Sequence, residues 1–565
     1  MKRCPECRRI YEDETLNFCL DDGARLVDIS EATDGPSTAS ISAHETEPAT
    51  MRLGPPSMSD PTSQSSIHVA SKRNSLIAGI IGIVVITALG LGSYLYYGRG
   101  ASSQIESIAV LPFINESGNS DLDYLSDGMT ETLINSLSRL PNLSVKARSS
   151  VFRYKGKDIN PKSLATELHV QSLLMGRVVQ RGDQITLNLE LIDPDNENVQ
   201  WGQRYERKIS QIVDLQSDIA RDVSEKLKAR LSGDDQAKVS KKDTADPEAY
   251  QLYLKGRFYW SKRTGDSLKQ ATEYFNKAIE KDPQYALAYS GLAESYSLYN
   301  SFNVASGKDS MPQAKAAAMK ALELDDSIAP AHAALGNYFA NYAWNPEASE
   351  KELRRAIEID PNYATAYHWL GNITLQTLGR FDESIAAGRK AEELDPLSPI
   401  IVADVGQNMF MARRFDDAIP QLKKSLNVEP TFSYAIYFLG ACYHAKGMYQ
   451  EAIAEYRRSL AIDDDTYARG LLVRSLVKAG QRSEAEKELG ALEQTARSRY
   501  VPSTSLAIAY ASLGRMDDAF IALDKEFEDR PTMFIYMRYD PSYDDLRSDP
   551  RFDKLLQRIS AAKIE

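Results

Sequence analysis

Residues 356–371, AIEIDPNYATAYHWLG, contain the pattern that decides the fold of the second half of the chain. An apolar run ends at Asp-Pro, and a second run, rich in small and aromatic residues, leads to a glycine. Proline lacks the backbone N–H that a helix interior needs, so it ends one helix and opens the next. The stretch therefore predicts two helices joined by a short turn.

The same pattern recurs along the chain at a nearly constant interval. The residue after the acidic position is Pro361 in this stretch, and its counterparts are Pro283, Asp326, Pro396, Pro430 and Asp464. Successive intervals are 43, 35, 35, 34 and 34 residues, and the first is longer because residues 301–310 are inserted. Such a period predicts about six to eight helical hairpins within residues 247–560.

These stretches are similar to tetratricopeptide repeats, in which small residues let the two helices of a hairpin approach closely. The glycines that share one phase are Gly336, Gly371, Gly406 and Gly440. One hairpin cannot bury its own apolar stripe, so neighbours are expected to stack into a right-handed solenoid with a concave groove. The resemblance implies a protein or peptide partner in that groove, and residues 543–559 are expected to cap the array.

Three carboxamide residues, Asn337, Asn372 and Gln407, directly follow repeat glycines. A carboxamide both donates and accepts hydrogen bonds, so a row of them on the inner face could hold an extended peptide backbone. The alternative interpretation is that these amides are solvated polar residues. The expected groove residues are Asn337, His368, Asn372, Gln407, Tyr437 and His444.

Residues 105–232 have the pattern of a small α/β domain. In residues 185–192, apolar and polar residues alternate, which predicts a strand with one buried face. Ser126 or Asp127 is expected to cap the first helix at its amino terminus. The expected strands are residues 105–113, 143–154, 172–180 and 185–192, and the expected helices are residues 123–141, 161–170 and 209–231.

Two longer phrases in this region, residues 107–157 and 201–220, resemble the TolB amino-terminal domain-like family. The resemblance implies an interaction or sensor module, without catalytic residues to transfer. Such domains recur in bacterial proteins labelled adenylate cyclase or serine/threonine kinase, between a membrane anchor and a repeat array. The Gly-rich phosphate loop, His-Arg-Asp and Asp-Phe-Gly motifs of a kinase do not occur before residue 75.

Residues 75–97, SLIAGIIGIVVITALGLGSYLYY, contain no charged residue across 23 positions. As a helix they would span about 34 Å, enough to cross the hydrocarbon core of a membrane. Lys72 and Arg73 precede the span and only Arg99 follows closely, which favours a cytoplasmic amino terminus. The sequence predicts a single-pass protein of the bacterial inner membrane, with its carboxyl-terminal domains outside the cytoplasm. Residues 29–73 are polar and rich in Ser, Thr and Pro, so they cannot bury enough apolar surface to fold. They are expected to form a disordered linker.

The first 28 residues predict a small zinc-ribbon head. Cys4 and Cys7 form one Cys-x-x-Cys turn, and Cys19 is followed at the same spacing by Asp22. Three thiolates and a carboxylate can surround one structural zinc ion tetrahedrally. Asp21, His44 or a water could replace Asp22 as the fourth ligand, and the alternative is a degenerate ribbon without metal.

Composition narrows the functional classes. A net charge of −12 argues against a nucleic-acid partner, which requires a basic surface. Neither His169 nor Cys442 has a recognisable nucleophile motif beside it, and Cys442 is expected to be a buried apolar residue. No small-molecule substrate is evident, so catalysis is not expected.

The sequence therefore predicts a non-catalytic, membrane-anchored scaffold whose fold class is multi-domain: zinc ribbon, one transmembrane helix, α/β domain and all-α repeat solenoid. One alternative is a signalling protein that passes occupancy of the outer domains to a cytoplasmic effector. Another is an enzyme with its chemistry in the α/β domain.

Overall fold

The computed structural model describes residues 2–3, 10–11, 27–28, 105–140, 142–227, 241–302, 304–527 and 530–564. The chain divides into two compact units, residues 1–98 and 99–565. In the first unit, β1 (Lys2–Arg3) pairs antiparallel with both β2 (Ile10–Tyr11) and β3 (Val27–Asp28). The expected zinc ligands, the linker and the expected membrane span lie outside the described residues. Within the described part of the chain, no helix is both long and apolar enough to span a bilayer.

The second unit begins with a mixed six-stranded sheet, in the order β6-β4-β7-β8-β9, with β5 beside β7. Strands β4, β5, β6 and β7 pair in parallel, whereas β7, β8 and β9 pair antiparallel. The strands are β4 (Ser107–Val110), β5 (Ile114–Asn115), β6 (Ser144–Val145), β7 (Ser172–Arg181), β8 (Gln184–Asp193) and β9 (Asn198–Lys208).

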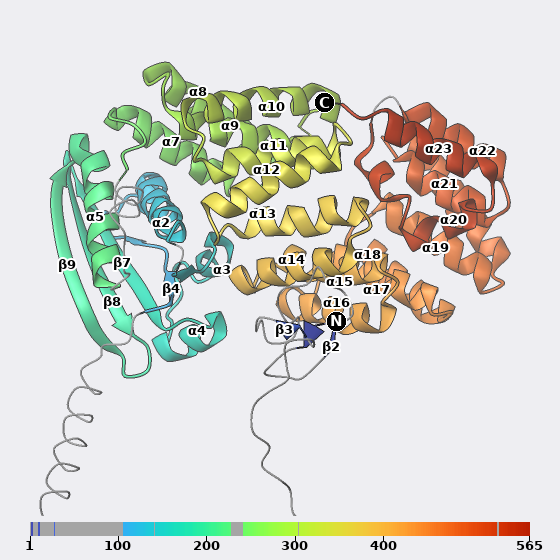
Figure 1. Ribbon diagram of the computed structural model, residues 1–565, viewed down its shortest axis with the longest axis horizontal. Coiled ribbons are helices and arrows are strands. Elements are labelled where there is room, and N and C mark those ends of the chain that lie inside the picture. Colours follow the sequence, from blue (N-terminus) through green and yellow to red (C-terminus); the bar gives the residue numbers. More distant parts are fainter. Residues whose placement is uncertain are drawn as a thin grey trace, which may run out of the picture. The chain divides into compact units, whose positions relative to one another are not determined.

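Helices complete this domain, and α5 lies against the sheet (Figure 1). The apolar residues of β8, Ile185 through Leu191 in alternation, are buried, which confirms the predicted period of two. The helices of this domain, including two short 3-10 helices labelled η, are η2 (Ser120–Leu122), α2 (Asp123–Ser138), α3 (Arg148–Phe152), α4 (Pro161–Leu168), η3 (Ile209–Gln211) and α5 (Ile212–Lys226).

Two local predictions in this domain are wrong, and one strand was not predicted. Ser126 and Asp127 do not cap the first helix, because η2 leads directly into α2 at Asp123 and both residues are buried inside the helix. The expected strand 143–154 is limited to β6, and its remainder forms α3. Strand β9 was not expected, because its exposed residues show no apolar alternation.

The helical half of the second unit contains eight helical hairpins within the described residues, in agreement with the predicted number (Figure 1). The hairpins are α7 (Pro247–Trp260) with α8 (Gly265–Lys281), α9 (Ala286–Leu298) with α10 (Gly307–Leu324), α11 (Ala329–Asn341) with α12 (Pro346–Ile359), α13 (Ala364–Trp369) and η4 (Leu370–Leu375) with α14 (Phe381–Leu394), α15 (Pro399–Met411) with α16 (Phe415–Val428), α17 (Ser433–Ala445) with α18 (Tyr449–Ile462), α19 (Thr466–Lys478) with α20 (Arg482–Ser498), and α21 (Ser503–Ser512) with α22 (Met516–Glu526).

After the last hairpin, η6 (Thr532–Tyr536), η7 (Pro541–Leu546) and α23 (Pro550–Ala561) complete the chain. The repeat glycines lie where the two helices of a hairpin touch. A Cβ at Gly371 would lie 2.7 Å from the carbonyl oxygen of Ser384, and one at Gly440 would lie 2.9 Å from the Tyr456 ring. The predicted role of these glycines in close approach is confirmed, and Cys442, as expected, is fully buried.

Candidate protein-binding surfaces

An acidic residue ends the second helix of each early hairpin, and four of these residues form what we call the aspartate ladder: Asp282, Asp325, Asp360 and Asp395. Their spacing is 325 − 282 = 43, 360 − 325 = 35 and 395 − 360 = 35 residues, which is the repeat period. The ladder therefore follows one edge of the array, where each hairpin turns into the next.

In the first three ladder residues, one carboxylate oxygen closes the local turn. The backbone N–H two residues further on donates to this oxygen, at 3.0 Å for Asp282, 3.1 Å for Asp325 and 3.0 Å for Asp360. Because a carboxylate has two oxygens and about four acceptor positions, the second oxygen remains available for another part of the chain.

The second oxygens of Asp282 and Asp325 bind residues 241–246, the segment that leads into α7. Thr244 Oγ1 donates to Asp282 at 2.5 Å, and Lys241 Nζ donates to Asp325 at 2.6 Å. These two contacts hold residues 241–246 against the aspartate ladder of the first two hairpins.

The other two ladder residues bind the α/β domain. Ser138 Oγ, at the end of α2, donates to Asp360 Oδ2 at 2.6 Å, and Ser150 Oγ in α3 donates to Asp395 Oδ1 at 2.6 Å. The Ser149 hydroxyl also donates to Asp395. Each bond joins a hydroxyl to a carboxylate, and hydrogen bonds to charged groups are the stronger kind.

Main-chain groups reinforce this contact and explain why α3 is a helix. The Ala147 N–H, just before α3, donates to the Leu394 carbonyl at 3.2 Å, which prevents residues 147–154 from continuing strand β6. Asn362 Nδ2 donates to the carbonyls of Ser138 at 2.8 Å and Leu143 at 2.7 Å. The α/β domain is thus bound to the repeats through both side chains and backbone.

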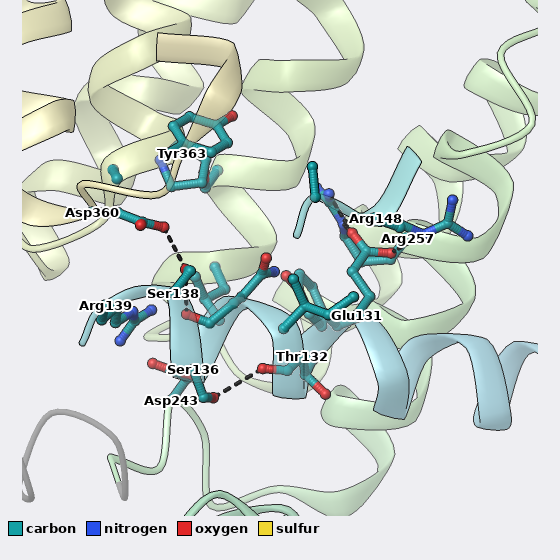
Figure 2. A pocket seen from close by; sticks show the side chains of 18 of the residues that line it. Glu131, Thr132, Ser136, Ser138, Arg139, Arg148, Asp243, Arg257, Asp360 and Tyr363 are labelled. Carbon is teal, nitrogen blue, oxygen red and sulfur yellow. Dashed lines mark hydrogen bonds and ion pairs between the residues drawn. The ribbon is translucent and has the colours of Figure 1, made fainter. Parts of the chain in front are cut away.

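A buried charge cluster crosses the same interface (Figure 2). Arg257 of α7 contacts Glu131 of α2 at 2.5 Å and Glu294 of α9 at 2.5 Å, and Arg148 of α3 contacts Glu131 at 3.0 Å. Arg257, Glu131 and Glu294 are only 8%, 3% and 5% exposed. Burial would raise the pKa of Glu131, but Arg257 and Arg148 hold that pKa below its ordinary value. The Arg257 guanidinium therefore links α7 to both α2 and α9.

A cavity of about 430 Å³ lies beside this cluster, between the α/β domain and the first repeats (Figure 2). Arg139 and Lys241 bring positive charge to its walls, and Asp243 and Asp360 bring negative charge. Its walls hold no residues arranged for metal binding, since no cluster of metal-ligating side chains occurs anywhere in the described part of the chain.

The expected groove residues of the middle repeats bind neighbouring side chains. Gln407 is 4% exposed, and its Oε1 accepts a hydrogen bond from Tyr434 at 2.7 Å. Asn372 Oδ1 accepts from Gln376 at 3.1 Å. Asn337 is also buried, and its Oδ1 has no hydrogen-bond partner among the described residues. The structure therefore brings two of the three carboxamides into internal contacts, and their role in peptide binding stays a prediction.

The other expected groove residues are also enclosed. His368 Nε2 lies 2.5 Å from a carboxylate oxygen of Asp404, and the buried Tyr437 ring lies 5.2 Å from that of Tyr434, centroid to centroid. His444 Nδ1 lies 2.7 Å from the Ser475 hydroxyl. Burial lowers the pKa of His444 to about 3, so this imidazole is a poor general base for that serine at neutral pH.

Different parts of the second unit match different family models. Residues 103–222 match the second domain of HilA/YgeH-like transcriptional regulators, whereas the resemblance to TolB stays a prediction. Over 228 residues the chain is 32% identical to "Putative adenylate cyclase 3" of Rhizobium meliloti (strain 1021), covering 40% of this chain. The match spans 39% of the length of that relative.

Two solved structures are among those similar to the chain. YrrB, described as a TPR protein with an unusual peptide-binding site, is 23% identical, with a TM-score of 0.26, 34% of this chain covered and 94% of YrrB. PilF of Pseudomonas aeruginosa is 20% identical, with a TM-score of 0.30, 37% of this chain covered and 95% of PilF. Residues 342–399 and 409–472 match tetratricopeptide repeat families directly. These two segments of the helical half are therefore tetratricopeptide repeats.

Proposed function

We propose that the chain is a non-catalytic, membrane-anchored scaffold whose tetratricopeptide repeats bind a protein or peptide partner outside the cytoplasm. The observation that carries the proposal is the array of eight helical hairpins, two segments of which match tetratricopeptide repeat families. Stacked hairpins of this kind present extended surfaces that bind other proteins.

Crosslinking in cells tests partner binding. A photoreactive amino acid replaces Tyr500, whose side chain is exposed, in one chain, and replaces Glu190, on the exposed face of β8, in a control chain. The scaffold role requires a reproducible adduct with one protein from the repeat position. Absence of any repeat-dependent adduct, with the chain present at its normal level, contradicts the proposal.

The membrane anchor and the orientation rest on residues 75–97 and their flanking charges. In a chain with Cys4, Cys7 and Cys19 replaced by Ser, a cysteine introduced at Tyr500, which is 70% exposed, reports the location of the repeats, because the remaining native cysteine, Cys442, is buried. In spheroplasts with an intact membrane, a membrane-impermeant maleimide should label this cysteine, whereas a cysteine introduced at Ser42 should react only after lysis. The reverse labelling pattern would contradict the proposed orientation.

The head is proposed to bind one structural zinc ion through Cys4, Cys7, Cys19 and Asp22. The donor set suits tetrahedral zinc, and the paired strands β1 and β2 flank the Cys4–Cys7 segment in the sequence. In the full chain with reduced thiols, we expect about one zinc per chain by mass spectrometry, and weaker retention after Asp22→Ala. A chain that retains no zinc has a degenerate ribbon.

A second candidate function is signalling across the membrane. Its support is the contact between the α/β domain, which lies nearer in the sequence to the expected membrane span, and the aspartate ladder of the repeats. A partner that binds the repeats and alters this contact would alter the position of the α/β domain, which follows the expected membrane span in the sequence. Crosslinking of the head to a cytoplasmic effector only when the repeats are occupied would favour signalling over scaffolding.

A further inference from the structure

Residues 530–546, which we call the C-terminal strap, lie against the first helices of the later hairpins. The strap contains η6 and η7, and it contacts α19 and α21 and the turns that follow η4 and α15. In these hairpins, the first helix is the one expected to line the concave groove. The strap therefore occupies a part of the surface where a peptide partner is expected.

Carboxylates of the strap contact basic and hydroxyl groups of this surface. Asp545 accepts from Arg474 at 2.9 Å and contacts Lys478 at 3.1 Å, both in α19. Asp544 accepts from Arg413 at 2.6 Å. Burial opposes ionisation of both aspartates, but these ion pairs hold their pKa values below the ordinary value, so both are charged at neutral pH.

A third carboxylate, that of Asp540, is fully buried and accepts from the Tyr467 hydroxyl of α19 at 3.2 Å. The aromatic residue before it, Tyr539, packs edge-on against Phe381 with 5.3 Å between ring centroids. The hydroxyl of Tyr539 reaches Gly379, where a Cβ would lie 2.6 Å from it. The surface thus has separate positions for a tyrosine and for three carboxylates.

The strap also lies over residues that the sequence predicted for the groove. The Tyr437 ring lies 5.8 Å, centroid to centroid, from the ring of Tyr467, whose hydroxyl donates to Asp540 of the strap. His444 bonds to the hydroxyl of Ser475, and the residue before this serine, Arg474, donates to Asp545. The expected peptide groove and the surface under the strap are therefore the same region at these two positions.

The strap is held by side chains and not by the backbone. The described backbone hydrogen bonds of residues 531–549 outside regular helix all remain within the strap and its junction with α23, as in Met537 to Phe534 and Tyr543 to Asp540. The Arg547 guanidinium also closes on strap carbonyls, at 2.7 Å for Arg538 and 3.1 Å for Asp540. Residues 532–546 can therefore leave the surface without breaking backbone–backbone bonds to the repeats, while the Arg530 guanidinium stays bound to the carbonyls of Tyr342 and Ala343.

We propose that the inner surface of α15–α21 binds acidic, tyrosine-containing peptides, and that the strap occupies it as an internal ligand until a partner segment of the same chemistry replaces it. The strap supplies the pattern, Tyr539-Asp-Pro-Ser-Tyr-Asp-Asp545. The proposal rests on the proposed function of the repeats as a protein-binding surface and names the class of partner. Arg413, Arg474 and Lys478 select for acidic side chains, and Tyr467 provides a hydroxyl donor to a fully buried carboxylate.

The test uses the full chain in detergent micelles and a fluorescent peptide of residues 536–546, YMRYDPSYDDL. Asp544→Asn with Asp545→Asn weakens the strap and leaves the surface intact. Because the competing strap loses its three ion pairs with the surface, the peptide should bind about tenfold more tightly to this variant than to the native chain. Adding Arg413→Met and Arg474→Met should remove the gain, since the surface then keeps only one of its three cations, Lys478.

The matched control is Asp517→Asn with Asp524→Asn, which removes two carboxylates that pair with Arg551 and Arg558 of α23, away from the inner surface. This control should bind the peptide like the native chain. Equal peptide binding by the native chain and the strap-weakened variant overturns the proposal, as does a gain that survives loss of the two arginines.

Hydrogen exchange of the native chain provides a second measurement that needs no variant. A displaceable strap requires the amides of residues 532–546 to exchange faster than those of α19, because the strap opens while the repeats stay folded. If both segments exchange at one common slow rate, the strap is a permanent part of the core, and the proposal is overturned. Crosslinking of a partner elsewhere on the repeats, without peptide binding, would contradict the strap proposal while leaving the scaffold role intact.

Discussion

Arg257→Met is the most informative single change, because one guanidinium neutralises two carboxylates between three helices. Methionine has a similar length but leaves Glu294 without its cation and leaves Glu131 with Arg148 alone. Removing one partner of a buried ion pair costs about 3–5 kcal/mol, because an uncompensated charge stays buried. Since Arg148 remains 3.0 Å from Glu131, we expect the lower end, about 3 kcal/mol.

The assay is hydrogen exchange of α2, α7 and α9 in the full chain. A loss of about 3 kcal/mol raises the local opening equilibrium roughly a hundredfold, which is readily measured as faster amide exchange. Arg204→Met is the matched control, because its ion pair with Glu206 is solvent-exposed and worth less than about 1 kcal/mol. Adding Glu294→Gln to Arg257→Met should restore part of the protection, because a neutral amide needs no cation. If Arg257→Met changes exchange no more than Arg204→Met does, the cluster does not hold the interface.

Three further outcomes follow from the contacts described. Asp395→Ala removes the acceptor of two serine hydroxyls in α3, a loss of about 2–4 kcal/mol, and should speed limited proteolysis after α3, whereas Asp382→Ala, on an exposed side chain, should not. Gly291→Ala places a Cβ 2.5 Å from a phenylalanine ring and should lower the unfolding free energy by about 1–3 kcal/mol, whereas Gly490→Ala meets open space and should be neutral or stabilising in thermal unfolding. Burial lowers the pKa of His444 to about 3, below the value of about 6.5 in the unfolded chain. Because the unfolded chain binds the proton more tightly, the unfolding free energy should fall as the pH drops from about 6.5 toward 3. His444→Gln should flatten this part of the pH–stability curve.

Local sequence predicted the helical half well because each repeat packs on its neighbour. The proline or aspartate at each turn between hairpins recurs at a nearly constant interval, and this spacing predicted about six to eight units, in agreement with the eight hairpins of the described residues. In the α/β domain, the alternation in residues 185–192 predicted β8 for the same reason, since one strand face is buried locally. These outcomes depend on residues close together in the chain.

Local patterns failed where a distant segment decides the conformation. Residues 143–154 resemble a strand, yet Arg148–Phe152 form α3, where Ala147 bonds to Leu394 and the serines of α3 bond to Asp395. The recurrence of an acidic residue at each turn was visible in the sequence. Its second role, holding another domain, was not visible, because the partner hydroxyls belong to a non-repeating part of the chain.

The sequence by itself therefore determined that the chain carries a tetratricopeptide repeat array after an α/β domain. Only the tertiary structure decided which surfaces of that array are occupied. Ser138 and Asp360 are 222 residues apart, and Tyr467 and Asp540 are 73 apart. A repeat period encodes contacts between adjacent hairpins, whereas contacts across such separations depend on where the folded array brings its edge and its inner face.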